Sequence, residues 1–167
     1  MTYTTHALSG VVLALSYAEF SGVTMDPLAL GITILASSLP DIDEPHSKAG
    51  KKVSGFSKVI KSIFGHRSIT HSLLGLVIFS YIYIRTANFL NITGFYLNFF
   101  IIGYAGHLLG DLFTNSGIPL LYPISQKFKF PLFKTGSIME GIIQMILVLF
   151  LVYNVFSGGR IVELNLF

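Results

Sequence analysis

The chain alternates long apolar stretches with shorter polar segments, and this pattern predicts five helices. The apolar stretches cover residues 7–23, 28–39, 73–90, 95–113 and 138–156. All but the second approach the roughly 20 residues that cross a hydrocarbon core about 30 Å thick. We therefore expect an all-α, polytopic membrane helical bundle of about five transmembrane spans. It would form a single integral membrane domain over residues 1–167.

The second stretch has clear helix boundaries but is short for a span. Asp26 suits the N-cap and Pro27 the first helical position, and Pro40 ends the run. About 13 residues at 1.5 Å each give about 20 Å, well short of the hydrocarbon core. Either the helix begins deeper in the sequence, or the bilayer thins, or the polar end of the helix is buried within the protein.

Composition agrees with a membrane protein. Hydrophobic residues make up 52% of the chain and charged residues 11%, against roughly 45–50% and about 25% in soluble domains. The mean hydropathy is +0.69. Cysteine is absent, so a transition-metal site would have to use His, Asp and Glu.

The basic residues predict the orientation of the chain. Five spans place the N-terminus and the loops 41–71 and 114–137 on one side, and only Arg85 and Arg160 fall on the other. The positive-inside rule makes the loaded side cytoplasmic, with the N-terminus inside and the C-terminus outside. The net charge of +3 is then explained by orientation and anionic headgroups, and we expect no nucleic-acid partner. We expect no cleaved signal peptide either.

Two loops carry the lysines. Residues 56–64 have near-helical apolar spacing, which fits an amphipathic helix lying on the headgroups or a solvated basic loop equally well. In the second loop Lys127, Lys129 and Lys134 alternate with phenylalanines, which is typical of an extended interfacial segment.

Seven candidate metal ligands fall on the predicted cytoplasmic side, although incidental residues would divide about equally between the two faces. They are His6, Asp41, Asp43, His66, His71, His107 and Asp111. His107 and Asp111 are four residues apart on one helix and so share a face. Ionisable groups inside a membrane span are costly and usually functional. His66 and His71 belong to the stretch 65–72, Gly-His-Arg-Ser-Ile-Thr-His-Ser, which leads into the third apolar run.

Imidazole and carboxylate together favour a divalent transition metal, with Zn²⁺ preferred and Mn²⁺ or Fe²⁺ as alternatives. Seven candidate ligands exceed what one catalytic ion needs. We therefore expect one or two ions, and two ions sharing a carboxylate suit phosphoester hydrolysis. Arg67 would bind a substrate phosphate or face lipid headgroups. Glu140 is better explained as a helix-start carboxylate than as a ligand.

A short internal similarity suggests a repeat. Residues 5–10, Thr-His-Ala-Leu-Ser-Gly, resemble residues 70–75, Thr-His-Ser-Leu-Leu-Gly, and each segment opens a two-helix hairpin that ends in aspartate. We expect a parallel two-hairpin repeat about an axis along the membrane normal, with the site on that axis.

Four motifs in order resemble the YdjM family. They are Thr5-His6, the Leu-Pro-Asp-Ile-Asp run at 39–43, the stretch 65–72, and Gly-Tyr-Ala-Gly-His-Leu-Leu-Gly-Asp at 103–111. The resemblance covers about residues 1–125. Members are small bacterial and archaeal proteins described as LexA-regulated, inner-membrane-associated, metal-dependent hydrolases. The resemblance thus implies inner-membrane location, metal dependence and a hydrolase activity, without a substrate.

Our hypothesis from the sequence is a metal-dependent hydrolase of phosphoesters, acting on a lipid or lipid-linked substrate at the cytoplasmic interface. The predicted ligands would hold the metal, Asp41 or Asp43 would be the general base, and Arg67 would stabilise charge. One alternative is a metal transporter or metal-sensing membrane protein without hydrolytic activity. Another is a structural or partner-binding protein in which the polar residues form a hydrogen-bond network. The oligomeric state does not follow from the sequence.

Overall fold

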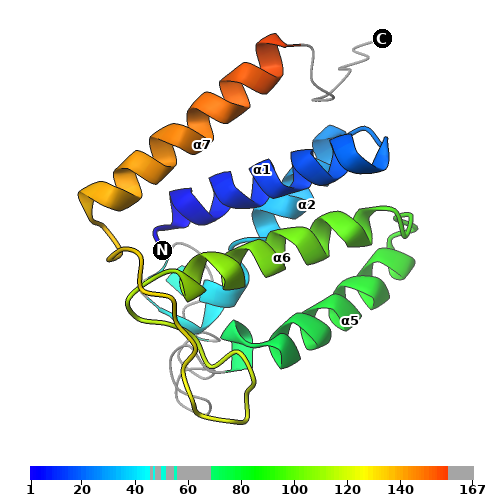
Figure 1. The fold of residues 1–167 in the computed structure, drawn as a ribbon. Coiled ribbons are helices and arrows are strands. Elements are labelled where there is room, and N and C mark those ends of the chain that lie inside the picture. Colours follow the sequence, from blue (N-terminus) through cyan, green and yellow to red (C-terminus); the bar gives the residue numbers. More distant parts are fainter. Residues whose placement is uncertain (46, 48–49, 52–54, 56–68, 158–167) are drawn as a thin grey trace.

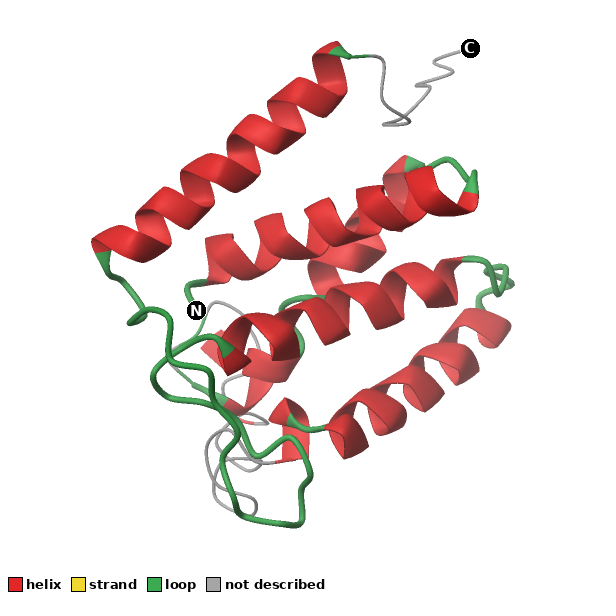
Figure 2. Ribbon diagram, in the orientation of Figure 1, coloured by secondary structure: helices red, strands yellow, loops and turns green. Residues whose placement is uncertain are grey.

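The computed structural model describes residues 1–45, 47, 50–51, 55 and 69–157. Within these residues the chain forms five α-helices and two short 3-10 helices, with no strand (Figure 2). The all-α prediction is therefore confirmed. The α-helices are α1 (Tyr3–Ser21), α2 (Pro27–Ala36), α5 (Leu73–Phe89), α6 (Tyr96–Leu112) and α7 (Ile138–Phe156), and the 3-10 helices are η1 (Pro40–Asp43) and η2 (Ile69–His71).

Side-chain caps start three of the helices. The carboxylate of Asp26 accepts a hydrogen bond from the Ala29 backbone N–H at 2.7 Å, as the Asp-Pro pair predicts. Ser72 and Ser137 cap α5 and α7 through their hydroxyls. Each cap satisfies a backbone N–H group that lacks an intrahelical partner, so these polar residues define where the apolar runs become helical.

The second helix is shorter than its apolar run. It has 10 residues, which is about 15 Å, and it ends at Ala36 before the polar turn η1. The side chain of Asp43 in η1 is completely buried. The polar end of α2 therefore lies within the protein.

The helix α6 is the centre of the bundle. It packs against α1, α2 and α5, while α7 packs on α1 (Figure 1). Gly103 permits α6 to pack closely on α2, because a Cβ atom there would lie 2.5 Å from the carbonyl oxygen of Thr33 in α2. Phe100, Tyr104 and Leu108 form a buried apolar core along the same helix.

One described helix, α7, is long and apolar enough to cross a membrane, whereas α2 and α5 are shorter apolar helices. Much of the α7 surface is exposed apolar side chain, including Met145, Ile146 and Leu149. That exposure fits a helix in contact with lipid. The expectation that all five helices span the bilayer stays a prediction.

The connectivity brings five helix ends together. The starts of α1, α5 and α7 lie at the same end of the bundle as the ends of α2 and α6 (Figure 1). The two 3-10 helices lie there too and contact each other. Most of the chain's candidate chemistry is therefore concentrated at one end.

Candidate metal centre

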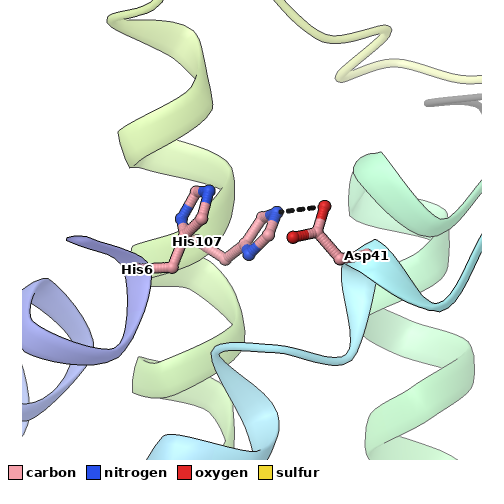
Figure 3. Close-up of side chains that lie close together, drawn as sticks. All are labelled: His6, Asp41 and His107. Atoms are coloured by element: carbon pink, nitrogen blue, oxygen red, sulfur yellow. Dashed lines mark ion pairs between the residues drawn. The ribbon is translucent and has the colours of Figure 1, made fainter. Parts of the chain in front are cut away.

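Five of the predicted ligands come together at this end of the bundle. They are His6 from α1, Asp41 from η1, His71 from η2, and His107 and Asp111 from α6. All are buried except for Asp41, whose side chain is 19% exposed. We call this group the polar cluster; Figure 3 shows three of its members, His6, Asp41 and His107.

Two histidines and two carboxylates bring four donor atoms close together. The Nε2 atoms of His71 and His107 are 3.3 Å apart, and Asp111 Oδ2 lies 3.7 and 3.8 Å from them. Asp41 Oδ1 lies 3.5 Å from His71 Nε2 and 3.8 Å from His107 Nε2. Donors around a tetrahedral zinc ion, bound at about 2.0–2.2 Å, are separated by roughly 3.3–3.6 Å. The observed spacings of 3.3–3.8 Å begin in this range and extend about 0.2 Å above it, so a small contraction of the cluster would suit a transition-metal ion.

His6 extends the cluster on the other side of His107. The two rings stack with centroids 3.6 Å apart, and His6 Nε2 is 3.3 Å from Asp111 Oδ1. Each oxygen of Asp111 therefore faces a different imidazole group, as a carboxylate shared between two ions would. The Met1 ammonium also contacts Asp111 Oδ1.

His6 is 1% exposed, and within the described part of the chain its Nε2 has the 3.3 Å ion-pair contact with Asp111 Oδ1, whereas neither ring nitrogen makes a hydrogen bond of good geometry. Burying an imidazole whose Nδ1 has no hydrogen-bond partner costs free energy. A bound cation would satisfy one of these nitrogens. Together with the donor spacings, this buried group indicates that the polar cluster fits a metal ion.

The backbone of Ser37 orients His107. Its carbonyl oxygen lies 2.7 Å from His107 Nδ1 and can only accept, so the ring carries its proton on Nδ1. The lone pair of Nε2 then points into the polar cluster. Ligand histidines are commonly held in this way by a carbonyl or carboxylate behind the ring.

Thr70 and Asp43 lie behind His71 in the same manner. The Thr70 hydroxyl is 3.1 Å from His71 Nδ1 and donates to Asp43 Oδ2 at 2.8 Å. Asp43 Oδ2 is itself 3.5 Å from His71 Nδ1. Asp43 thus contacts the ring edge opposite the donor atom Nε2. Tyr104 fixes the turn by donating its hydroxyl to the Thr70 carbonyl at 2.6 Å.

The two aspartates of η1 also determine the charge of His71. Burial lowers the pKa of His71, but hydrogen bonds with Asp41 and Asp43 outweigh it and raise the pKa to about 9. Burial raises the pKa of Asp41, but the hydrogen bond with His71 and the nearby charge of His107 bring it below its usual value. An imidazolium between carboxylates occupies the same electrostatic position that a metal cation would take.

Glu140 lies outside the polar cluster and joins α7 to α1. Its carboxylate accepts hydrogen bonds from the Thr2 N–H at 2.6 Å, the Thr5 hydroxyl at 2.7 Å and the Gly136 N–H at 2.6 Å. Gln144, one turn later, donates to the Thr5 hydroxyl at 2.7 Å. Both side chains therefore hold the first turn of α1, which carries His6.

His66 and Arg67 lie outside the described residues, as does the segment 56–64. Their predicted roles as ligand and phosphate-binding residue stay predictions. Sequence reasoning did not identify Ser37, Thr70 or Tyr104. For Thr70 a signal was present, because it directly precedes His71 in the motif, but a threonine next to a histidine has no specific meaning without the fold.

Comparison with known proteins identifies one family of inner membrane proteins. Residues 1–164 match the family described as "YdjM inner membrane protein". The Bacillus subtilis strain 168 protein named "Uncharacterized protein YvsG" is 36% identical over 145 residues, which is 86% of this chain and 87% of that protein. "Inner membrane protein YdjM" of Escherichia coli K12 is 37% identical over 117 residues, 68% of this chain and 60% of that protein. The protein of the same name in Shigella flexneri matches to the same extent. No solved structure matches the chain.

Proposed function

The chain belongs to the YdjM family of inner membrane proteins, and on that premise we propose that it is a metal-dependent phosphoester hydrolase of the inner membrane. The observation that carries the proposal is the convergence of His6, Asp41, His71, His107 and Asp111 at one end of the bundle. His71, His107 and Asp111 would hold one ion, and His6 with the second oxygen of Asp111 would provide for another. Zn²⁺ is favoured, with Mn²⁺ or Fe²⁺ as alternatives.

The proposed membrane arrangement has five spans with the N-terminus in the cytoplasm. The exposed apolar side chains of α5, such as Val77 and Tyr81, and those along α7 support a lipid-facing surface on both helices. In the sequence the lysine-bearing segments follow α2 and α6, and the C-terminal ends of these two helices lie at the end of the bundle that holds the polar cluster (Figure 1). The positive-inside rule places that end at the cytoplasmic interface.

A bound divalent ion would supply a Lewis acid for a phosphoryl oxygen and would lower the pKa of a water molecule. The chain's own residues prepare this chemistry. Ser37 and Thr70 hold the His107 and His71 rings with Nε2 facing the cluster. Asp41 is partly exposed and ionised at neutral pH, so it is placed to accept a proton as general base.

For the buried Asp43 we propose a positioning role in place of the predicted role as general base or ligand. Because it contacts His71 Nδ1 and accepts from Thr70, we assign it to positioning His71. Arg67 is proposed to bind the substrate phosphate, since its planar fork of donors matches phosphate oxygens.

The alternative function for these polar residues is metal transport. It needs ligands along a path through the bilayer. At the far end of the bundle, Asp26 accepts a hydrogen bond from the Tyr96 hydroxyl at 2.6 Å, and the apolar core of Phe100, Tyr104 and Leu108 lies along α6 between there and the cluster. The hydrolase is therefore better supported by the described residues.

The test is a screen of phosphoester hydrolysis with purified protein, comparing wild type with His71→Ala and with the control Asn98→Ala. Asn98 is exposed and contacts Tyr17 at the far end of α6. We expect metal-dependent phosphate release by wild type and Asn98→Ala, and a loss of about a hundredfold in His71→Ala. Metal flux in proteoliposomes without turnover would favour a transporter. Equal turnover by His71→Ala would refute the proposed site.

A further inference from the structure

An apolar cavity of about 330 Å³ lies between α1, α6 and α7. Its walls include Val12 and Leu13 from α1, Leu109 and Phe113 from α6, and Ile143 and Leu147 from α7. The two hydroxyl groups in the lining are already engaged, because Thr5 donates to Glu140 and Ser9 donates to the His6 carbonyl. Among the described residues no charged side chain lines the cavity, and the ammonium of the lining residue Met1 is paired with Asp111. Its chemistry therefore suits hydrocarbon and excludes an ion or a polar headgroup.

The cavity is directly behind the polar cluster. Gly106 and Gly110 form part of its α6 wall, and each immediately precedes a cluster residue, His107 or Asp111. A Cβ atom at Gly110 would clash with the Met1 side chain, which also lines the cavity, and would lie 3.5 Å from His6 Nδ1. The same helix thus presents small residues to the cavity and donor atoms to the cluster, so the cavity and the cluster adjoin each other at Gly110 and Met1.

The cavity also reaches the surface of the bundle. Leu13, Leu109 and Phe113 line it and are 39%, 49% and 40% exposed. The surface beside it on α7 carries exposed Met145 and Ile146. In the proposed membrane arrangement this surface faces acyl chains, so the molecules most concentrated at the entrance are membrane lipids.

We propose that this cavity binds one hydrocarbon chain of a phosphorylated lipid and places the phosphate of that lipid at the polar cluster. The proposal rests on the proposed function, because it names the substrate class of the same site. A lipid held by its chain gains the orientation that a phosphoester needs at the donor atoms. The shared chemistry of a phosphate joined to a long apolar chain fits both a diacyl phospholipid and an isoprenyl phosphate.

Photolabelling tests chain binding without requiring turnover. The protein in phosphatidylcholine nanodiscs is exposed to two probes, a phosphatidic acid and an isoprenyl monophosphate, each with a diazirine in its chain. We expect labels on the cavity-lining peptides of α1 and α6, competed by the unlabelled lipid. The probe that labels them identifies whether the chain is acyl or isoprenyl.

Two matched substitutions locate the binding. Val12→Phe fills the cavity, whereas Val152→Phe makes the same change on α7 outside the cavity, at a position 44% exposed. We expect Val12→Phe to lower the labelling of α1 and α6 by about tenfold and Val152→Phe to leave it unchanged. If Val12→Phe does not fold, the positions labelled in wild type decide the question.

Labels distributed equally over all lipid-facing helices, or unaffected by Val12→Phe, would overturn the proposal. The result is separate from that of the proposed function. Cavity labelling without any phosphoester turnover contradicts the hydrolase but supports chain binding. Turnover combined with labels outside the cavity contradicts chain binding alone.

Discussion

Thr70→Val is expected to weaken metal binding although Thr70 is not a ligand. The Thr70 hydroxyl lies 3.1 Å from His71 Nδ1 and donates to Asp43 Oδ2 at 2.8 Å, and the residue is 2% exposed. Valine keeps the shape and removes both contacts. Loss of the group behind a ligand histidine costs 10–100-fold in metal affinity, or about 1.4–2.7 kcal/mol.

The control for this substitution is Thr33→Val. Thr33 is equally buried, but its hydroxyl donates to the Ala29 carbonyl within its own helix at 2.8 Å, away from the polar cluster. Zn²⁺ affinity measured by competition with a chromophoric chelator should fall in Thr70→Val alone. Both variants should lose about 1–3 kcal/mol of stability through the missing hydrogen bonds. Equal zinc affinity in the two variants would refute the orienting role of Thr70.

Four further predictions rest on the described contacts. The pKa of His71 is raised to about 9, so metal binding at neutral pH must displace the proton of His71. Zinc affinity should therefore rise about tenfold per pH unit from pH 6.5 to 9. Calorimetry in buffers of different ionisation enthalpy counts the proton released. In the metal-free protein the stability from protonated His71 is complete below about pH 6.5 and is lost as pH rises through 9, which a pH series of thermal melts would show. Glu140→Gln should lower the melting temperature, because an amide cannot accept hydrogen bonds from all three donors around Glu140. Glu19→Gln, in the exposed end of α1, serves as control. Equal melting temperatures for the two variants would exclude the role of Glu140 in joining α7 to α1. Gly103→Ala should destabilise the protein by about 1–3 kcal/mol, since its Cβ would lie 2.5 Å from a backbone oxygen. The control Gly141→Ala, whose Cβ would have nothing within 4 Å, should be neutral or stabilising. A larger loss of stability in Gly141→Ala than in Gly103→Ala would contradict the packing of α2 on α6.

The sequence was sufficient for the architecture because apolar runs and caps are local signals. The predicted run 138–156 coincides with α7, and the Asp26-Pro27 pair begins α2 as expected. The convergence of His6, His71 and His107 followed from counting alternating helices, since an even number of crossings returns the chain to the same end. The polar turn after α2 was recognised from the sequence, but the burial of Asp43 depends on the contacts of η1 with η2 and α6.

Other features depend on tertiary contacts that no local pattern contains. Asp41 and Asp43 are two residues apart and looked equivalent as candidate bases. In the fold Asp41 faces the donor atoms and Asp43 contacts the opposite edge of His71. Glu140 was expected to stabilise the start of its own helix, yet it also accepts hydrogen bonds from Thr2 and Thr5, more than 130 residues away in sequence. The apolar cavity arises where three helices meet and cannot be read from any one of them.

Elemental analysis of the purified protein tests the metal centre most directly. Wild-type protein prepared without chelator is expected to contain about one or two equivalents of a transition metal per chain. His107 belongs to both three-residue groups of nearby donor atoms, His6 with Asp41 and His71 with Asp111. The His107→Ala variant should therefore contain much less metal while keeping its helical circular dichroism. Wild-type protein without stoichiometric transition metal, or a folded His107→Ala variant with the same metal content as wild type, would contradict the account.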